Sequence, residues 1–144
     1  MAVALSASAF AAGADVNVTS TSLALRGYDP VSYQLAGAPQ QGDFGIVAEH
    51  EGAIYRFVNE QNKATFLADP AKYAPQFGGY CAYGAAKGLK FDGDPNVWKV
   101  VDGKLYLNLA PKVADLWKAD MKAEIMAANE KWPQIKNTPA AELK

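Results

Sequence analysis

The stretch Tyr73–Gly88, YAPQFGGYCAYGAAKG, decides how this chain must be organised. It holds the only cysteine, Cys81, which is flanked by Tyr80 and Tyr83 and preceded by two glycines. Paired glycines accept positive φ and let backbone approach backbone closely. If the residues after the glycines are helical, the two tyrosines lie three positions apart and share one face. The stretch is therefore predicted to be either a packing centre or a site.

Composition limits the classes of protein to which the chain can belong. It has 144 residues, of which 50% are hydrophobic and 20% charged, and its formal net charge is −1. These values are typical of one globular domain with a sizeable core. Lys and Arg are scattered rather than gathered in a basic patch, which argues against a nucleic-acid partner. A single cysteine excludes an intramolecular disulfide.

The first fourteen residues, MAVALSASAFAAGA, are small and apolar. Ala9-Phe10-Ala11 has the small-x-small form of a signal-peptidase site, and we expect export, for example to the periplasm, with a mature chain beginning near Ala12. No basic residue precedes this stretch, so residues 1–14 are interpreted as the remnant of a longer signal peptide. A disordered Ala-rich tail is the alternative. No other segment has the length of a membrane span, so we expect no integral membrane segment in the mature chain.

Two short β-hairpins are predicted on either side of the central stretch. In the first, the runs 46–49 and 53–58 surround Gly52 and alternate in polarity. In the second, the runs 98–101 and 104–107 surround Asp102-Gly103, one of the strongest local hairpin signals.

Three helices are predicted around the hairpins. Asp29 is suited to cap a short helix over Pro30–Leu35. Asn59 is suited to cap a second helix, which Asp69-Pro70 ends or reorients. The longest helix is expected from Pro111 to Trp132, with Pro133 stopping it. Its apolar residues recur at spacings of three and four, and they are Val113, Trp117, Met121, Ile125, Ala128 and Trp132.

These elements predict an α+β fold. We expect a small single domain over residues 15–136, with two short β-hairpins, the Gly-rich stretch around Cys81 and a long C-terminal helix. Residues 137–144 are expected to form a flexible tail. The sequence shows no evident internal repeat.

The chain resembles the YHS domain-containing proteins of the longer, exported bacterial type. The motifs that carry the resemblance are GYDPVSY (27–33), YRFVNEQNKATFLADPAKYAPQFGGYCAYGAAKG (55–88) and GDPNVWKVVDGKLYLNL (93–109). The resemblance implies a small α+β module associated with metals. Cysteines found in the shorter YHS modules are absent here, where Ser32, Val58 and Asn62 stand instead. The resemblance therefore does not carry the metal role over directly.

Binding or handling of a ligand is the expected role, and the resemblance makes a transition-metal ion, such as copper, zinc or another heavy metal, the first candidate for that ligand. Cys81 and His50 are the only soft or borderline ligands, and Glu49 and Glu51 flank His50. A closed zinc site or a blue-copper centre needs more Cys and His than one chain supplies, which leaves an open site or one completed across a dimer. The alternatives are a solvated His50 at its turn and a Cys81 that packs as a small hydrophobe.

Two further functions stay open at this stage. Cys81 activated by His50 would make a thiol-dependent redox or hydrolytic enzyme, although no catalytic motif surrounds the thiol, and a non-enzymatic protein is favoured. A small ligand is the other partner, for which Tyr28, Asp29, Tyr80 and Tyr83 are the pocket candidates. A purely structural or interaction module is the remaining alternative.

Overall fold

The computed structural model describes residues 15–144. In chain order the helices and strands are α2 (Ser32–Leu35), β1 (Asp43–His50), β2 (Ala53–Phe57), α3 (Glu60–Ala68), α4 (Pro70–Tyr73), α5 (Ala82–Ala86), β3 (Asp94–Val101), β4 (Lys104–Asn108), α6 (Pro111–Ala119) and α7 (Met121–Ile135). Single 3-10 turns are η1 (Leu25–Gly27), η2 (Gln76–Gly79) and η3 (Ala140–Glu142). The predicted signal-peptide remnant, residues 1–14, lies outside the described residues.

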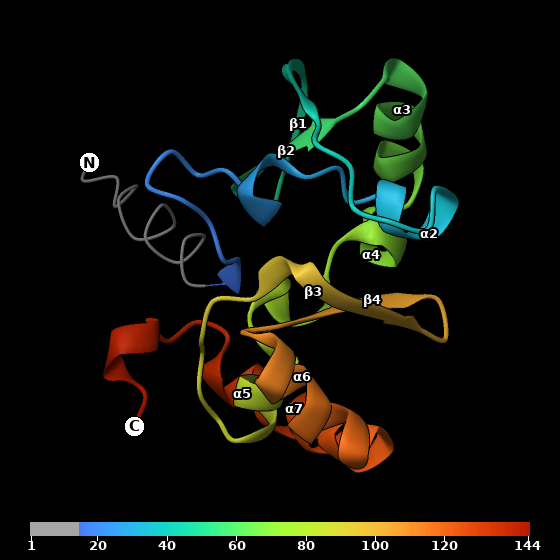
Figure 1. The fold of residues 1–144 in the computed structure, drawn as a ribbon. Coiled ribbons are helices and arrows are strands. Elements are labelled where there is room, and N and C mark those ends of the chain that lie inside the picture. The colour runs from blue at the N-terminus through green and yellow to red at the C-terminus, as the bar shows by residue number, and fades with distance from the viewer. Residues whose placement is uncertain (1–14) are drawn as a thin grey trace, which may run out of the picture.

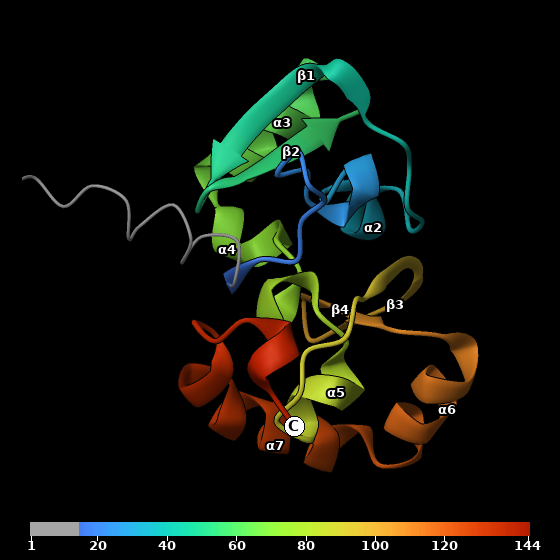
Figure 2. The ribbon, with the colours of Figure 1, turned by 90° about the vertical axis from the view of Figure 1, so that its left-hand side faces the viewer.

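The order of elements repeats. A 3-10 turn, a short helix, a β-hairpin and two helices occur as η1-α2-β1-β2-α3-α4 and again as η2-α5-β3-β4-α6-α7. From β1 to the start of α4, every element boundary recurs with a constant shift of 51 residues, as in Asp43 and Asp94. Figures 1 and 2 show the first half, in blue to green, stacked on the second, in yellow to red. An internal structural repeat therefore underlies the fold, contrary to the expectation from the sequence.

The two hairpins match in register as well as in length. Asp43 pairs with Phe57 and Asp94 with Asn108, and in each hairpin the register then shifts by a bulge before regular pairing resumes. Both turns place two residues at positive φ, Glu51-Gly52 and Asp102-Gly103. This is the turn geometry that suits the twist of two-residue hairpins. Both predicted hairpins are confirmed, each longer than the sequence pattern indicated.

The turns before the short helices repeat too, with a shift of 52 residues. Leu25, Arg26 and Gly27 have φ values of 53°, 50° and 86°, and Phe77, Gly78 and Gly79 have 56°, 62° and 82°. The repeat is hard to see in the sequence because few identities mark it. They fall mainly at turns, helix ends and one buried tyrosine: Gly27/Gly79, Tyr28/Tyr80, Gly42/Gly93, Asp43/Asp94, Gly52/Gly103, Tyr55/Tyr106 and Asp69/Asp120.

The predicted single helix from Pro111 to Trp132 is wrong, because the chain breaks at Asp120 into α6 and α7. Asp120 has φ −145° and ψ 55°, close to the −155° and 75° of Asp69 between α3 and α4. Proline marks the break in the first half, whereas Met121 follows it in the second and gives no signal. Pro133 does not stop α7, which runs on to Ile135. The long C-terminal helix is thus confirmed, but over fewer residues.

The core joins the halves into a single domain, and the predicted α+β class is confirmed. One buried cluster centres on Phe57 and Phe66 of the first half and also includes Leu105 and Leu107 of β4. A second cluster packs α5 against α6 and α7 around Trp117. Within residues 15–144, no helix is both long and apolar enough to traverse a lipid bilayer.

Candidate functional site

Cys81 caps a helix in the interior of the second half. Its side chain is fully buried, and Sγ accepts a hydrogen bond from the backbone N–H of Gly84 at 3.5 Å, in the first turn of α5. Sγ also lies 3.5 Å from Oδ1 of Asn108, to which the thiol donates. A nucleophilic or metal-binding cysteine needs an accessible thiolate, and a fully buried thiol does not provide one. The geometry favours the packing interpretation of Cys81.

Asp29 holds the equivalent place in the first half. Its Oδ1 accepts from the backbone N–H of Val31 at 2.7 Å, and its Oδ2 accepts from Val58 N at 2.9 Å and from Asn62 Nδ2 at 2.8 Å. The carboxylate is fully buried and joins the start of α2 to the end of β2 and to α3. The helix was predicted to begin at Pro30, but α2 begins at Ser32, because Asp29 first closes a turn over Pro30. Asp29 is thus a structural anchor.

His50 lies at the end of β1, where its ring packs edge-on against Phe66 with 5.7 Å between ring centroids. Its Nε2 is 3.8 Å from Oε1 of Glu51, and the side chain is 28% exposed. His50 is therefore half-buried rather than fully solvated. It belongs to the first half, whereas Cys81 belongs to the second. Within residues 15–144, no three His, Cys, Asp or Glu side chains gather into a group that could hold a metal ion.

The three tyrosine candidates lie in different environments. The hydroxyl of Tyr28 is 3.3 Å from Asn96 Nδ2, across the contact between the halves. Tyr80 is buried, and its ring stands 5.2 Å from Lys90 Nζ; burial is the main cause of its raised pKa. Tyr83 is half-buried, with Lys87 Nζ 4.6 Å above its ring. Tyr80 precedes α5 in an extended conformation, so the predicted shared helical face of Tyr80 and Tyr83 does not form.

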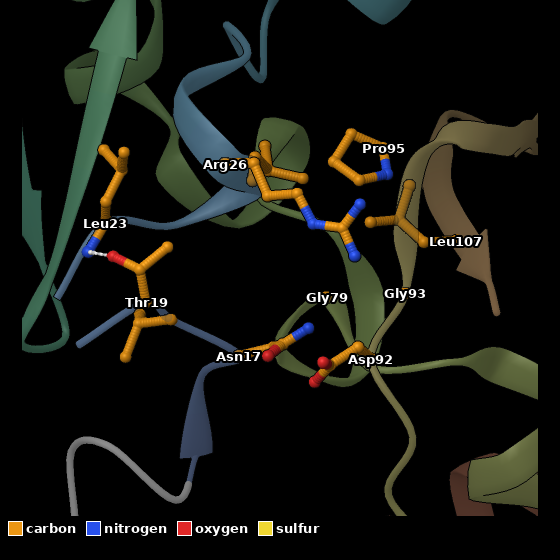
Figure 3. A pocket seen from close by; sticks show the side chains of 11 residues that line it. Asn17, Thr19, Leu23, Arg26, Gly79, Asp92, Gly93, Pro95 and Leu107 are labelled. Atoms are coloured by element: carbon orange, nitrogen blue, oxygen red, sulfur yellow. Dashed lines mark hydrogen bonds between the residues drawn. The ribbon is translucent and has the colours of Figure 1, made fainter. Parts of the chain in front are cut away.

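A cavity of about 150 Å³ opens where the two halves meet; we call it the junction cavity. The N-terminal segment covers one side, η1 supplies another, and the loop leading into β3 closes it (Figure 3). Its wall requires glycine at Gly93, since a Cβ there would lie 2.7 Å from Cβ of Leu107. The lining residues include Asn17, Thr19, Leu23, Arg26, Gly79, Asp92 and Pro95.

Three polar side chains converge on the junction cavity. The Arg26 guanidinium extends over it, opposite the side chains of Asn17 and Asp92 (Figure 3). The nearest carboxylate, that of Asp94, is 3.9 Å from Arg26 Nη1, which is longer than a hydrogen bond. Arg26 holds positive φ, a conformation that costs energy in a residue with a Cβ.

The sequence does not mark these residues as a site. Arg26 is a single charged residue beside a glycine, Asn17 lies nine residues before it, and Asp92 lies 66 residues after it. The one signal is that Arg26 is charged, whereas the equivalent position in the second half is Gly78. Comparisons with family models, with curated proteins and with solved structures found no match for this chain.

Proposed function

We propose that this chain is an exported, non-enzymatic binding protein of YHS type, and that its ligand is a small polar molecule held in the junction cavity. The observation that carries the proposal is the convergence of Arg26, Asp92 and Asn17 on one cavity between the two halves. A concave site with a few convergent polar groups, placed at an interface between structural units, is typical of small-ligand pockets. The volume of about 150 Å³ admits a ligand of about benzene's size or smaller.

The charges on the lining indicate the chemistry of the ligand. Arg26 offers a fork of N–H donors that suits a carboxylate or another planar anion. Asp92 offers acceptors for an ammonium or hydroxyl group. A small zwitterion, such as an amino acid, offers a partner to both residues at once. The buried, hydrogen-bonded Cys81 supports a protein that binds its ligand without a thiol-dependent reaction.

The test uses glycine, which carries both charges, with acetate and methylamine as probes of one charge each. We expect calorimetry to show saturable glycine binding that is stronger than binding of either single-charge probe. Arg26→Gln should weaken glycine binding about tenfold or more, because charge-assisted hydrogen bonds are lost. The matched control is Lys122→Gln, which removes an exposed positive charge on α7.

Two results would overturn this proposal. One is glycine binding that is undetectable or unchanged in Arg26→Gln. The other is a stoichiometric transition metal in the purified, tag-free protein that Cys81→Ala or His50→Ala removes without unfolding the chain. That outcome would restore metal handling as the function, because both residues would then be ligands.

A further inference from the structure

The wall of the junction cavity has a counterpart in the first half. Asp92 forms an isolated antiparallel bridge with Tyr80, and Gln41 forms the same bridge with Tyr28. Gln41 is therefore the first-half equivalent of Asp92. The two halves show the same place twice, and its contents can be compared.

In the first half, an arginine side chain fills this place. Arg56 lies on β2, and a Cβ at Gly42 would be 2.5 Å from Cβ of Arg56. A Cβ at Gly27 would be 3.2 Å from Nη1 of the same arginine. The side chain of Arg56 therefore starts beside Gly42 and lays its guanidinium against Gly27.

In the second half, the equivalent of Arg56 is Leu107, in the same hairpin register. Its side chain starts at the equivalent point, because a Cβ at Gly93 would lie 2.7 Å from Cβ of Leu107. A Cβ at Gly79, however, would meet only Pro75 within 4 Å. Leu107 is too short to reach Gly79, and both residues line the junction cavity (Figure 3). The cavity thus includes space that an arginine head group fills in the first half.

The charges change together with the volume. The first half has a cation, Arg56, and an uncharged neighbour, Gln41. The second half has the uncharged Leu107 and a carboxylate, Asp92. The exchange removes a positive charge and adds a negative one beside the space that opens. Charge complementarity favours a cation in that space.

We infer that the ligand of the junction cavity is a small guanidino acid, whose guanidinium takes the place of the Arg56 head group. This inference rests on the function proposed above and narrows its ligand from small zwitterions in general. A guanidinium is smaller than benzene and fits a cavity of about 150 Å³. Its planar fork of N–H donors pairs with both oxygens of a carboxylate such as Asp92.

Arg26 supplies what a free ligand needs and a side chain does not. Arg56 is held in place by its own backbone, whereas a ligand must be held by a second contact. Arg26 extends over the junction cavity, and its equivalent in the second half is Gly78. The guanidinium of Arg26 is suited to bind the carboxylate at the other end of the ligand.

The test uses guanidinoacetate, with N-carbamoylglycine and free glycine as probes. N-carbamoylglycine has nearly the same shape and keeps the carboxylate, but its urea group carries no charge. Glycine carries its positive charge as an ammonium. We expect calorimetry to show that guanidinoacetate binds about tenfold or more tightly than either probe, because it alone makes two charge-assisted hydrogen bonds to Asp92.

Variants locate the guanidinium. Asp92→Gln introduces the residue found in the first half at an exposed position, so the fold should be kept. It should weaken guanidinoacetate binding about tenfold or more and leave N-carbamoylglycine binding unchanged, because only the charged ligand uses the carboxylate. The matched control is Asp115→Gln, an exposed aspartate on α6 outside the cavity lining, which should change neither.

The outcomes separate this inference from the function on which it rests. Glycine binding that depends on Arg26, with guanidinoacetate no tighter than glycine or N-carbamoylglycine, would overturn the guanidino ligand and leave the proposed function standing. Equal weakening of guanidinoacetate and N-carbamoylglycine in Asp92→Gln would contradict the placement of the cation beside Asp92. No binding of any of the three compounds would refute both proposals.

Discussion

The two halves of this protein share a backbone but differ in what they bury. Each places a 3-10 turn, a short helix, a bulged hairpin and a nine-residue helix in the same order. The interior of the first half is aromatic and anchored by a carboxylate, whereas the second has a thiol, an amide and an indole at the equivalent positions. The exchanged pairs are Asp29/Cys81, Phe57/Asn108 and Phe66/Trp117.

This backbone is specified mainly by its turns. The positions that stay identical include two pairs of glycines at positive φ and the aspartates at the bulge and at the helix break, beside a third pair of glycines and two pairs of tyrosines. Such residues decide where the chain reverses, because most other residues are strained there. Core positions between them can change chemistry as long as they stay buried. In the second half, Asn108 and Trp117 place polar groups at positions that are apolar in the first half.

The largest expected effect comes from emptying the equivalent core positions. Phe66→Ala and Trp117→Ala should each lower the free energy of unfolding by about 3–5 kcal/mol, since both side chains are fully buried. Because Leu105 and Leu107 of the second half belong to the same buried cluster as Phe57, we expect one cooperative transition in every case. Urea denaturation followed by circular dichroism measures this. Two separate transitions would show that the halves do not share one core. An unchanged midpoint would show that the substituted side chain is not part of the core.

The equivalent residues Asp29 and Cys81 should differ in how strongly they stabilise the fold. Asp29→Ala leaves three donors without an acceptor in the interior and should cost about 2–3 kcal/mol. Cys81→Ala removes a weak cap from a five-residue helix together with the long thiol hydrogen bond to Asn108, and should cost about 1 kcal/mol. Chemical denaturation of both variants gives the comparison. A larger loss for Cys81→Ala than for Asp29→Ala would contradict the equivalence of the two positions.

Alkaline pH should affect the equivalent tyrosines unequally. Burial raises the pKa of both Tyr55 and Tyr106, and the turn residues Glu51 and Asp102 add to it. Unfolded tyrosine ionises near pH 10, so above that pH the unfolded chain releases protons that the folded chain keeps, and stability falls as pH rises.

Tyr55 is the more deeply buried of the two, and its slope should reach about 1.4 kcal/mol per pH unit. Tyr55→Phe should therefore reduce the alkaline loss of stability more than Tyr106→Phe does. Thermal melts between pH 8 and 11 would show the difference. Equal slopes in both variants would mean that the two hydroxyls experience the same environment.

The smallest signal is expected from labelling Cys81. Because the thiol is fully buried, a thiol reagent should react only when the second half opens, and the rate should rise with urea. Protein unfolded in urea is the positive control. Labelling of the native protein as fast as a free peptide thiol would show that Cys81 is accessible and would revive the interpretation of this residue as a ligand or nucleophile.

Local signals in the sequence were enough to predict the fold class, both hairpins, the Asn59 cap and the break at Asp69-Pro70. Each depends on residues within a few positions of one another, such as Asp102-Gly103 in a tight turn or Asn59 Oδ1, which accepts from Asn62 N at 2.7 Å. The break at Asp120 was missed because no proline follows it. Its equivalence to the break at Asp69 becomes visible only when the two halves are aligned in space.

Local sequence signals specify the hairpin turns and the Asn59 cap, and with them the class of fold. Tertiary structure alone decided which residues share a cavity, such as Arg26 and Asp92 at the junction. It also decided that Cys81 is a buried cap and that His50 lies in the other half. The reason is the separation along the chain over which each interaction acts. Turn and cap preferences act through neighbouring backbone, whereas a site depends on side chains that only the packing of distant segments brings together.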